Sequence, residues 1–326
     1  MKRREFITLV GGAAAAWPVA ANAQQVAVPM IGYLSIGSPE SDAARLTGLR
    51  QGLVETGYVE GRDLGIEYRW AGNQFDRLPM LAAQLVQARV AAIVTPGLPP
   101  TLAAKAATTT IPILFAVGAD PVQIGLVASL NRPGGNLTGF NQFNSELGAK
   151  GLSLLHELVP NAPTIAFLVN PTNPIDQLIE RDVVVAARVI GLQIQTLKAS
   201  NVREIDAAFE SLQQTRTDAL LVGNDVFLNG QIEQIIALAT RHAIPAMHSS
   251  REFSLAGGLI SYGTSLTDTY RQIGLYAGRI LKGVRPSDLP VIQSTKLGLV
   301  INLKTAKTLG LTIPPGVLAI ADEVIE

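Results

Sequence analysis

Short apolar runs and amphipathic stretches alternate along this chain, and one such passage occurs twice. Residues 89–97 (RVAAIVTPG) form an apolar run that ends in Pro and Gly, and residues 216–225 (RTDALLVGND) form a second run that ends in Gly, Asn and Asp. In both copies a helix-like stretch follows, and an Ile-Pro step at Ile111 or Ile244 opens the next apolar run. This order is typical of a βαβ unit, so its repetition predicts two similar α/β lobes.

The remaining pattern repeats the same order of strands and helices in both halves. The stretch 42–55 is expected to be a helix because it places Leu46, Leu49 and Leu53 on one face. Strands are predicted at 30–35, 64–70, 91–95 and 113–117, then at 164–169, 192–197, 219–222 and 258–262, with further helices at 77–87, 176–190 and 266–281. After residue 290 we expect a strand pair within 295–301 and a short helix at 303–309.

Alternation of this kind predicts an α/β fold with two doubly wound parallel-sheet lobes joined by a hinge. The segment 129–139 (SLNRPGGNLTG) is dense in turn residues, and we interpret it as a connecting turn before a crossing near 140–145. The domains expected are a leader at 1–23, an N-terminal lobe from 24–141 plus about 266–293, and a C-terminal lobe from 142–265 plus about 294–326.

The first residues have the composition of an export signal. Lys2, Arg3 and Arg4 precede a short apolar run at 6–16, and 21–23 (ANA) is a small-x-small cleavage site. Both the twin-arginine and the Sec route fit this segment. The chain contains no cysteine, which excludes a lipid-modified N-terminal cysteine and a disulfide framework. We therefore expect a periplasmic protein that is not a lipoprotein.

Charge and composition narrow the possible partners. Loss of the leader removes three basic residues and one acidic residue, which changes the formal charge from 0 to −2. A nearly neutral chain is not expected to bind nucleic acid. The three histidines, His156, His242 and His248, lie in unrelated contexts, and no phosphate loop, dinucleotide fingerprint or G-x-S-x-G elbow occurs. We expect no catalytic residues, no metal site and no cofactor.

Small polar residues follow the predicted strands. In open α/β sheets such positions line the ligand crevice, and the next helix offers free N–H groups. Asp225 and Asp120 are the acids placed this way, and Asp225 is the better candidate because Gly223 before it leaves room for a ligand. The predicted ligand-binding residues are Ser35, Ser38, Thr95, Gly97, Asp120, Asn170, Thr172, Asn173, Asn224, Asp225, Phe227, Ser249 and Tyr262.

For several of these residues a purely structural role is the alternative. Ser, Thr, Asn and Asp are also selected as helix caps at strand-to-helix turns, which applies to Ser38, Thr172 and Asp225. Asp120 precedes Pro121 and fits a plain turn equally well. If Asp225 binds a ligand, its replacement by Ala is expected to weaken binding with little loss of stability in the ligand-free protein.

Several motifs together resemble a known family. They are 30–35 (MIGYLS), 57–61 (GYVEG), 66–71 (IEYRWA), 120–122 (DPV), 132–139 (RPGGNLTG) and 301–307 (INLKTAK). The chain resembles the substrate-binding proteins of ABC importers of the tryptophan/tyrosine-type group over essentially its whole mature length. The resemblance implies a type I periplasmic-binding-protein fold with three hinge strands. It also implies a ligand clamped between the lobes and delivered to a membrane permease with its ATPase.

The resemblance leaves the ligand open. Some members of the group resemble amino-acid binders in which a Pro-Thr-Asp-Asn segment helps to hold the ligand, whereas this chain has 223–226 (GNDV) there. An amino acid, an aromatic acid or another small carboxylate remains possible.

The function expected is that of a monomeric solute receptor. A periplasmic sensory module that reports to a receptor partner is the alternative, and an exported enzyme is disfavoured because no nucleophile and base occur at catalytic spacing. In either binding role, residues 95–97 and 223–225 should face each other across one cleft.

Overall fold

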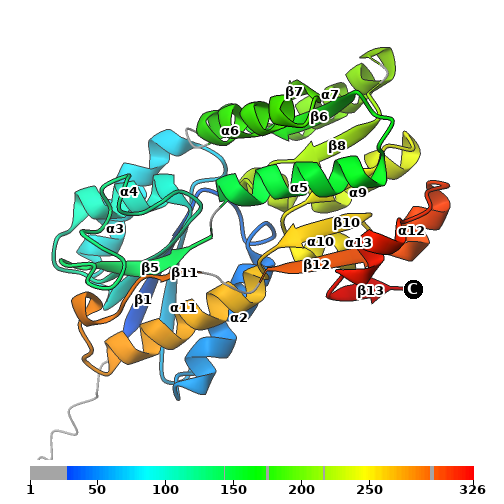
Figure 1. Cartoon of the computed structure of the whole chain (residues 1–326). Helices are drawn as coiled ribbons and strands as arrows, with labels where there is room; N and C mark the ends of the chain where they lie inside the picture. Colours follow the sequence, from blue (N-terminus) through cyan, green and yellow to red (C-terminus); the bar gives the residue numbers. More distant parts are fainter. Residues whose placement is uncertain (1–27, 143, 174–175, 216, 294–296) are drawn as a thin grey trace, which may run out of the picture.

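Two β-sheets organise the computed structural model, which describes residues 28–142, 144–173, 176–215, 217–293 and 297–326 (Figure 1). The first sheet has the strand order β11-β5-β4-β3-β1-β2, and the second has the order β13-β12-β10-β9-β8-β6-β7. The predicted leader, residues 1–23, lies outside the described residues. The two α/β sheets agree with the predicted fold class.

The first sheet is parallel throughout. Alternate side chains of its strands point to opposite faces, and each face packs on a different pair of helices. Helices α2 (Ala43–Glu55) and α11 (Leu266–Leu281) cover one face, and α3 (Leu78–Gln87) and α4 (Leu98–Ala107) cover the other. The strands are β1 (Met30–Ser35), β2 (Gly65–Trp70), β3 (Ala92–Pro96), β4 (Ile113–Val117), β5 (Leu137–Asn141) and β11 (Ile292–Gln293).

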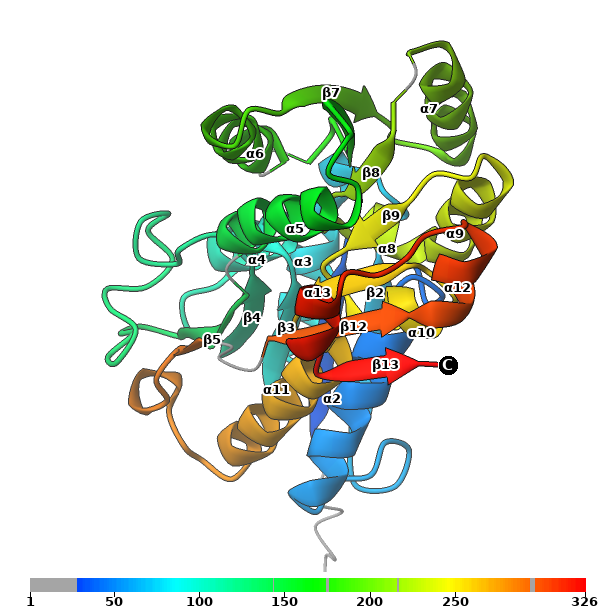
Figure 2. The ribbon, with the colours of Figure 1, turned by 45° about the vertical axis from the view of Figure 1, so that its right-hand side comes forward.

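The second sheet is parallel except where β10 pairs with β12. Its strands are β6 (Thr164–Val169), β7 (Gln193–Lys198), β8 (Ala219–Val222), β9 (Ala246–His248), β10 (Ile260–Gly263), β12 (Gly298–Asn302) and β13 (Glu323–Ile325). Helices α5 (Asn144–Leu158), α6 (Asp176–Val189), α12 (Leu303–Thr308) and α13 (Pro315–Ala319) contribute to one core, and α7 (Val202–Thr215), α8 (Val226–Gly230), α9 (Ile232–Arg241) and α10 (Arg251–Leu255) to the other. Figure 2 shows the C-terminal elements at one edge of this sheet.

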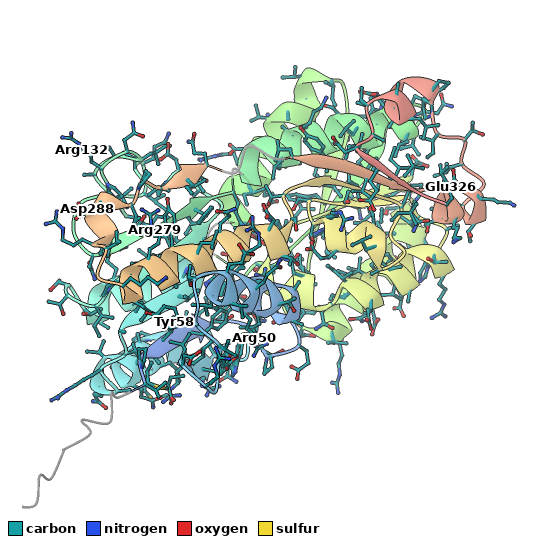
Figure 3. All side chains as sticks on the ribbon, turned by 90° about the horizontal axis from the view of Figure 1, so that it is seen from below. Arg50, Tyr58, Arg132, Arg279, Asp288 and Glu326 are labelled. Atoms are coloured by element: carbon teal, nitrogen blue, oxygen red, sulfur yellow. The ribbon has the colours of Figure 1, made fainter. Side chains whose placement is uncertain are left out.

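The chain passes between the two sheets after β5, after β10 and after β11. Each sheet is therefore built from segments that are far apart in the sequence. Arg279 of α11 and Asp288 follow β10 of the second sheet in the sequence, yet they belong to the first lobe. Figure 3 shows them at the end of that lobe that is remote from Glu326, the C-terminus, which lies in the second lobe.

One predicted turn contains a strand. The segment 129–139 was expected to be a connecting turn, but Leu137–Asn141 forms β5 beside β4. Gly139 explains the difference, because a Cβ at this position would lie 2.0 Å from the carbonyl oxygen of Phe115. The glycine that suggested a turn is needed for close contact between neighbouring strands.

Helices α2 and α11 lie side by side and contact each other through glycines (Figures 1 and 3). A Cβ at Gly52 would lie 1.9 Å from the carbonyl oxygen of Arg271, and a Cβ at Gly274 would lie 2.3 Å from that of Leu49. Both obstacles are backbone atoms, so neither helix can relieve the overlap by rotating a side chain. The first lobe therefore depends on these small residues.

We expect Gly52→Ala to lower the free energy of unfolding by about 3 kcal/mol, because the added methyl group forces two packed helices apart. Urea unfolding followed by circular dichroism measures the effect. Gly316→Ala is the matched control, since no atom lies within 4 Å of the position of its Cβ in helix α13. Equal midpoints for the two variants would show that α2 and α11 are not packed as described.

Candidate functional site

A cavity of about 50 Å³ lies between the two sheets, and we call it the central cavity. The first sheet contributes the segments that follow β3 and β4, together with one side chain from α2. The second sheet contributes the segments that follow β6 and β8. The residues lining it include Arg45, Pro96, Gly97, Leu98, Gly118, Gln142, Asn173, Asn224, Asp225 and Val226. From the two segments that the repeated passage predicts to face each other, Pro96 and Gly97 line one side of this cavity and Asn224 and Asp225 the other.

The wall from the first sheet includes the N-terminus of α4. Gly97 is the N-cap residue, with a φ of 90° that glycine adopts readily. The Thr101 hydroxyl donates to the Gly97 carbonyl at 2.6 Å, and the hydroxyls of Thr95 and Thr101 lie 2.9 Å apart. Thr95 is fully buried, and its contact with Thr101 stabilises the turn at Gly97. The cavity therefore meets the backbone at Gly97 and not the Thr95 side chain.

Arg45 brings a buried positive charge to the same wall. It lies on α2 with 4% of its surface exposed, and its Nη1 donates to Asp42 Oδ1 at 2.9 Å and to the Ser41 carbonyl at 3.1 Å. The Tyr33 hydroxyl donates to Asp42 Oδ2 at 3.0 Å. Burial is the largest single influence and disfavours the charge of Arg45, but Asp42, Tyr270, Tyr33 and Glu252 together outweigh it, so the pKa of Arg45 lies above its usual value. Arg45 is thus a permanent cation at the cavity.

Asp225 occupies the opposite wall and also caps a helix. Its Oδ1 accepts from the N–H groups of Phe227 at 2.9 Å and Leu228 at 3.2 Å, which are in the first turn of α8. The same oxygen accepts from Asn170 Nδ2 at 3.0 Å, and Oδ2 accepts from Asn173 Nδ2 at 2.9 Å. The capping role weighed from the sequence is therefore present, and the same carboxylate lines the cavity.

A second buried carboxylate, Asp176, lies behind Asp225. Asp176 Oδ1 accepts from Asn173 Nδ2 at 3.0 Å, and Oδ2 accepts from the Asn170 N–H at 2.9 Å. Both acids are 3% exposed, and within the described residues neither forms an ion pair with a basic side chain. Burial, and then the charge of Asp225, raises the pKa of Asp176 to about 8. Burial also raises the pKa of Asp225, whereas the hydrogen bonds from Asn170, Leu228, Asn173 and Phe227 oppose that shift. Two carboxylates this deeply buried disfavour a double negative charge, and Asp176, which accepts fewer hydrogen bonds, is the one that is protonated first.

Several predicted site residues serve local turns. The Ser35 hydroxyl accepts from the Gly37 N–H, and Ser38 bonds with Glu40 and Ser41. Exposed Asp120 accepts from the N–H groups of Val122 and Gln123, and exposed Thr172 donates to Asn170 Oδ1. Phe227 packs against the core of the second lobe. Among the described cavities, none is lined by Ser35, Ser38, Asp120, Asn170, Thr172 or Phe227.

Apart from Thr95, the other predicted residues line two neighbouring cavities. Gly97, Asn173, Asn224 and Asp225 line the central cavity. Asn224 also lines a smaller cavity of about 20 Å³ between α5 and the ends of β8, β9 and β10, together with Ser249 and Tyr262. We call this space the lobe-2 cavity. Whether any of these residues binds a ligand stays a prediction.

Comparison with known proteins identifies relatives over nearly the whole described length. A family model for "ABC transporter substrate binding protein" matches residues 31–325. A relative named "Tyrosine-binding protein" from Clostridioides difficile is 28% identical over 276 residues, which cover 83% of this chain and 77% of the relative. A crystal structure of an ABC domain in complex with L-Trp from Streptococcus pneumonia is 27% identical, covers 91% of this chain and 99% of that one, and has a TM-score of 0.79.

The arrangement of the lobes can be compared with a second solved structure. The ligand-free, open form of a substrate-binding protein with adhesive properties from Clostridium difficile is 26% identical and covers 91% of this chain and 99% of that one. Its TM-score is 0.62, below the 0.79 of the L-Trp complex. At similar identity and equal coverage, this chain therefore superposes more closely on the L-Trp complex than on the open form.

Proposed function

This chain belongs to the ABC transporter substrate-binding proteins, a family of binding proteins and not of enzymes, and on that premise we propose that it binds an amino acid in the central cavity and delivers it to a membrane permease. One observation carries the proposal. A buried cation from the first lobe, Arg45, and a buried anion from the second, Asp225, line the same cavity. Opposite charges on opposite walls are the complement of a zwitterion.

Each wall offers suitable groups for one end of an amino acid. The guanidinium of Arg45 has five N–H donors, of which Asp42, Ser41 and Tyr270 use some, and its planar fork suits a carboxylate. The N-terminus of α4 lines the same cavity, but Pro99 and Pro100 have no N–H, so in its first three residues it offers a negative group only the N–H of Leu98. Asp225 faces the ammonium group. The relatives named for tyrosine and crystallised with L-Trp support this substrate class.

Contacts between the lobes support closure around the ligand. Asn73 Nδ2 donates to the Ser200 carbonyl across the lobes at 2.8 Å, and a Cβ at Gly37 would lie 2.9 Å from Val226 Cγ1. A space of about 50 Å³ holds only a few water molecules, so the lobes must part to admit an amino acid. In this proposal the three connections after β5, β10 and β11 act as the hinge.

The transport role includes the location and partners expected from the sequence. The protein acts in the periplasm after loss of residues 1–23, as a monomer that meets an ABC permease with its ATPase and does not bind nucleic acid. No helix within the described residues is long and apolar enough to cross a membrane.

Isothermal titration of refolded, ligand-free protein against the protein amino acids tests the proposal. We expect at least one L-amino acid to bind, and its N-acetyl and carboxamide derivatives to bind at least 100-fold more weakly, because each derivative removes one charge of the zwitterion. The proposal would be refuted if either derivative bound as tightly as the amino acid, or if no amino acid bound at all.

Arg45→Lys is expected to weaken amino-acid binding about 10- to 100-fold, because lysine keeps the charge beside Asp42 but lacks the two-pronged geometry that binds a carboxylate. Titration with the best-binding amino acid measures the change. Arg50→Lys is the matched control on the same helix, since the side chain of Arg50 is 47% exposed and pairs with Glu60. Equal affinities for the two variants would place the carboxylate elsewhere.

A further inference from the structure

The lobe-2 cavity contains buried polar atoms without hydrogen-bond partners. Within the described residues, His248 Nε2 and Ser249 Oγ make no hydrogen bond of ordinary geometry. Both residues line the lobe-2 cavity, and His248 is 1% exposed. A buried donor or acceptor that finds no partner costs about 1–3 kcal/mol. Such atoms beside an open space indicate that a polar group occupies it at some stage of function.

The state of the His248 ring follows from its neighbour. The Ser250 N–H donates to His248 Nδ1 at 2.8 Å, so Nδ1 is the acceptor and Nε2 carries the proton. Burial lowers the pKa of His248 to about 4, with the Gly223 backbone opposing the shift. The ring is therefore neutral at the pH of the periplasm. Its Nε2–H lies near the Gly223 carbonyl, but this contact falls short of ordinary hydrogen-bond geometry, so the donor can still bind an oxygen or nitrogen acceptor.

The rest of the lobe-2 cavity is mainly apolar. Phe167, Leu221, Met247 and Tyr262 line it from the sheet. Gly151 of α5 leaves the space open, because a Cβ there would lie 3.3 Å from Met247 Cε. The volume of about 20 Å³ fits one group of the size of a water molecule. A small polar group at the end of an otherwise apolar chain matches both the lining and the size.

We propose that the lobe-2 cavity receives a hydroxyl group at the end of the ligand's side chain, with the oxygen accepting from His248 Nε2–H. The inference rests on the proposed binding of an amino acid in the central cavity, and Asn224 connects the two because it lines both cavities. A hydroxyl also has a proton to donate, and the Ser249 Oγ accepts it. The two cavities then select a zwitterion that carries a hydroxylated side chain.

Two pairs of probes that differ by one hydroxyl test the inference by isothermal titration. L-tyrosine is compared with L-phenylalanine, and L-threonine with L-valine. We expect the hydroxylated member of at least one pair to bind at least 10-fold more tightly, because the other member leaves Nε2–H unpaired. Binding without such a preference would overturn this inference and leave the proposed function unaffected. The same result is expected if only a water molecule fills the lobe-2 cavity. Absence of binding by every amino acid would overturn both.

Variants of His248 separate its two ring nitrogens. In His248→Asn the side-chain oxygen can still accept from the Ser250 N–H, but the donor at the Nε2 position is lost. We expect the preference for the hydroxylated probe to fall below threefold. His248→Gln places an amide N–H near the Nε2 position and should retain a larger part of the preference. His242→Asn, on a partly exposed histidine at the end of α9, is the control. Full preference in His248→Asn would overturn the role of Nε2.

Discussion

Replacing Asp225 with Asn is expected to weaken amino-acid binding by about 30- to 1,000-fold. The change removes the negative charge that faces the ligand ammonium, and loss of one partner of a buried charged pair costs about 2–4 kcal/mol. Asn is also a good N-cap residue, so the bonds from Phe227 and Leu228 to the capping oxygen persist. Titration measures the affinity, and the fluorescence of Trp70 on β2 offers a second signal of binding.

Asp120→Asn is the matched control for this experiment. Asp120 also accepts from two backbone N–H groups, but it is exposed and does not line the central cavity. The control should bind as the unchanged protein does. If Asp225→Asn also binds normally, Asp225 acts only as a cap and the ammonium lies elsewhere.

The structure changes the expectation for Asp225→Ala. From the sequence this variant was expected to lose affinity with little loss of stability. Asp225 accepts hydrogen bonds from Phe227, Leu228, Asn170 and Asn173, and Ala would remove all of these acceptors. Loss of an N-cap alone costs about 1 kcal/mol. Asparagine keeps one oxygen to accept from Phe227, Leu228 and Asn170 and loses only the acceptor for Asn173, so it comes closer than alanine to removing the charge alone.

Much of the fold is predictable from the sequence because its strands are short apolar runs with clear ends. β1, β4 and β6 begin and end where the pattern predicts them, and α11 matches its predicted range. β5 was missed because its Gly139 has the composition of a turn, although the glycine permits contact with β4. β13 was missed because a strand of three residues at a sheet edge leaves no periodic pattern.

The candidate site is only partly predictable, for a physical reason. Sequence indicates that a polar residue follows a strand, but not whether its side chain turns back to cap a helix or faces the cleft. Asp120 caps a turn, whereas Asp225 caps a helix and faces the cavity. Arg45 was missed because it lies inside a helix, where its three-residue spacing from Asp42 looks like an ordinary surface pair. Asp176 was missed because an acid in the first turn of α6 is unremarkable in sequence.

Asp176 makes the stability of the ligand-free protein depend on pH. Its pKa is raised from the model-peptide value of 3.8 to about 8, mainly by burial and then by the charge of Asp225. The folded protein therefore keeps a proton that the unfolded chain releases between these values. Stability from this group is fully present below pH 4 and is lost as the pH rises towards 8. The loss is at most about 1.4 kcal/mol per pH unit for one proton.

We expect Asp176→Asn to remove this dependence, because an uncharged amide of the same shape has no charge to bury. Relative to the unchanged protein, the variant should gain at least about 2 kcal/mol of unfolding free energy between pH 4 and pH 8. A constant offset accompanies this gain, because the amide keeps only one of the two oxygens that accept from Asn173 and Asn170. Urea unfolding of ligand-free protein across this range measures the difference. Asp182→Asn, on an exposed acid of the same helix, should show a difference that is constant with pH. A constant difference for Asp176→Asn as well would mean that the buried pair holds no proton, and that the second lobe offers the ligand two negative charges.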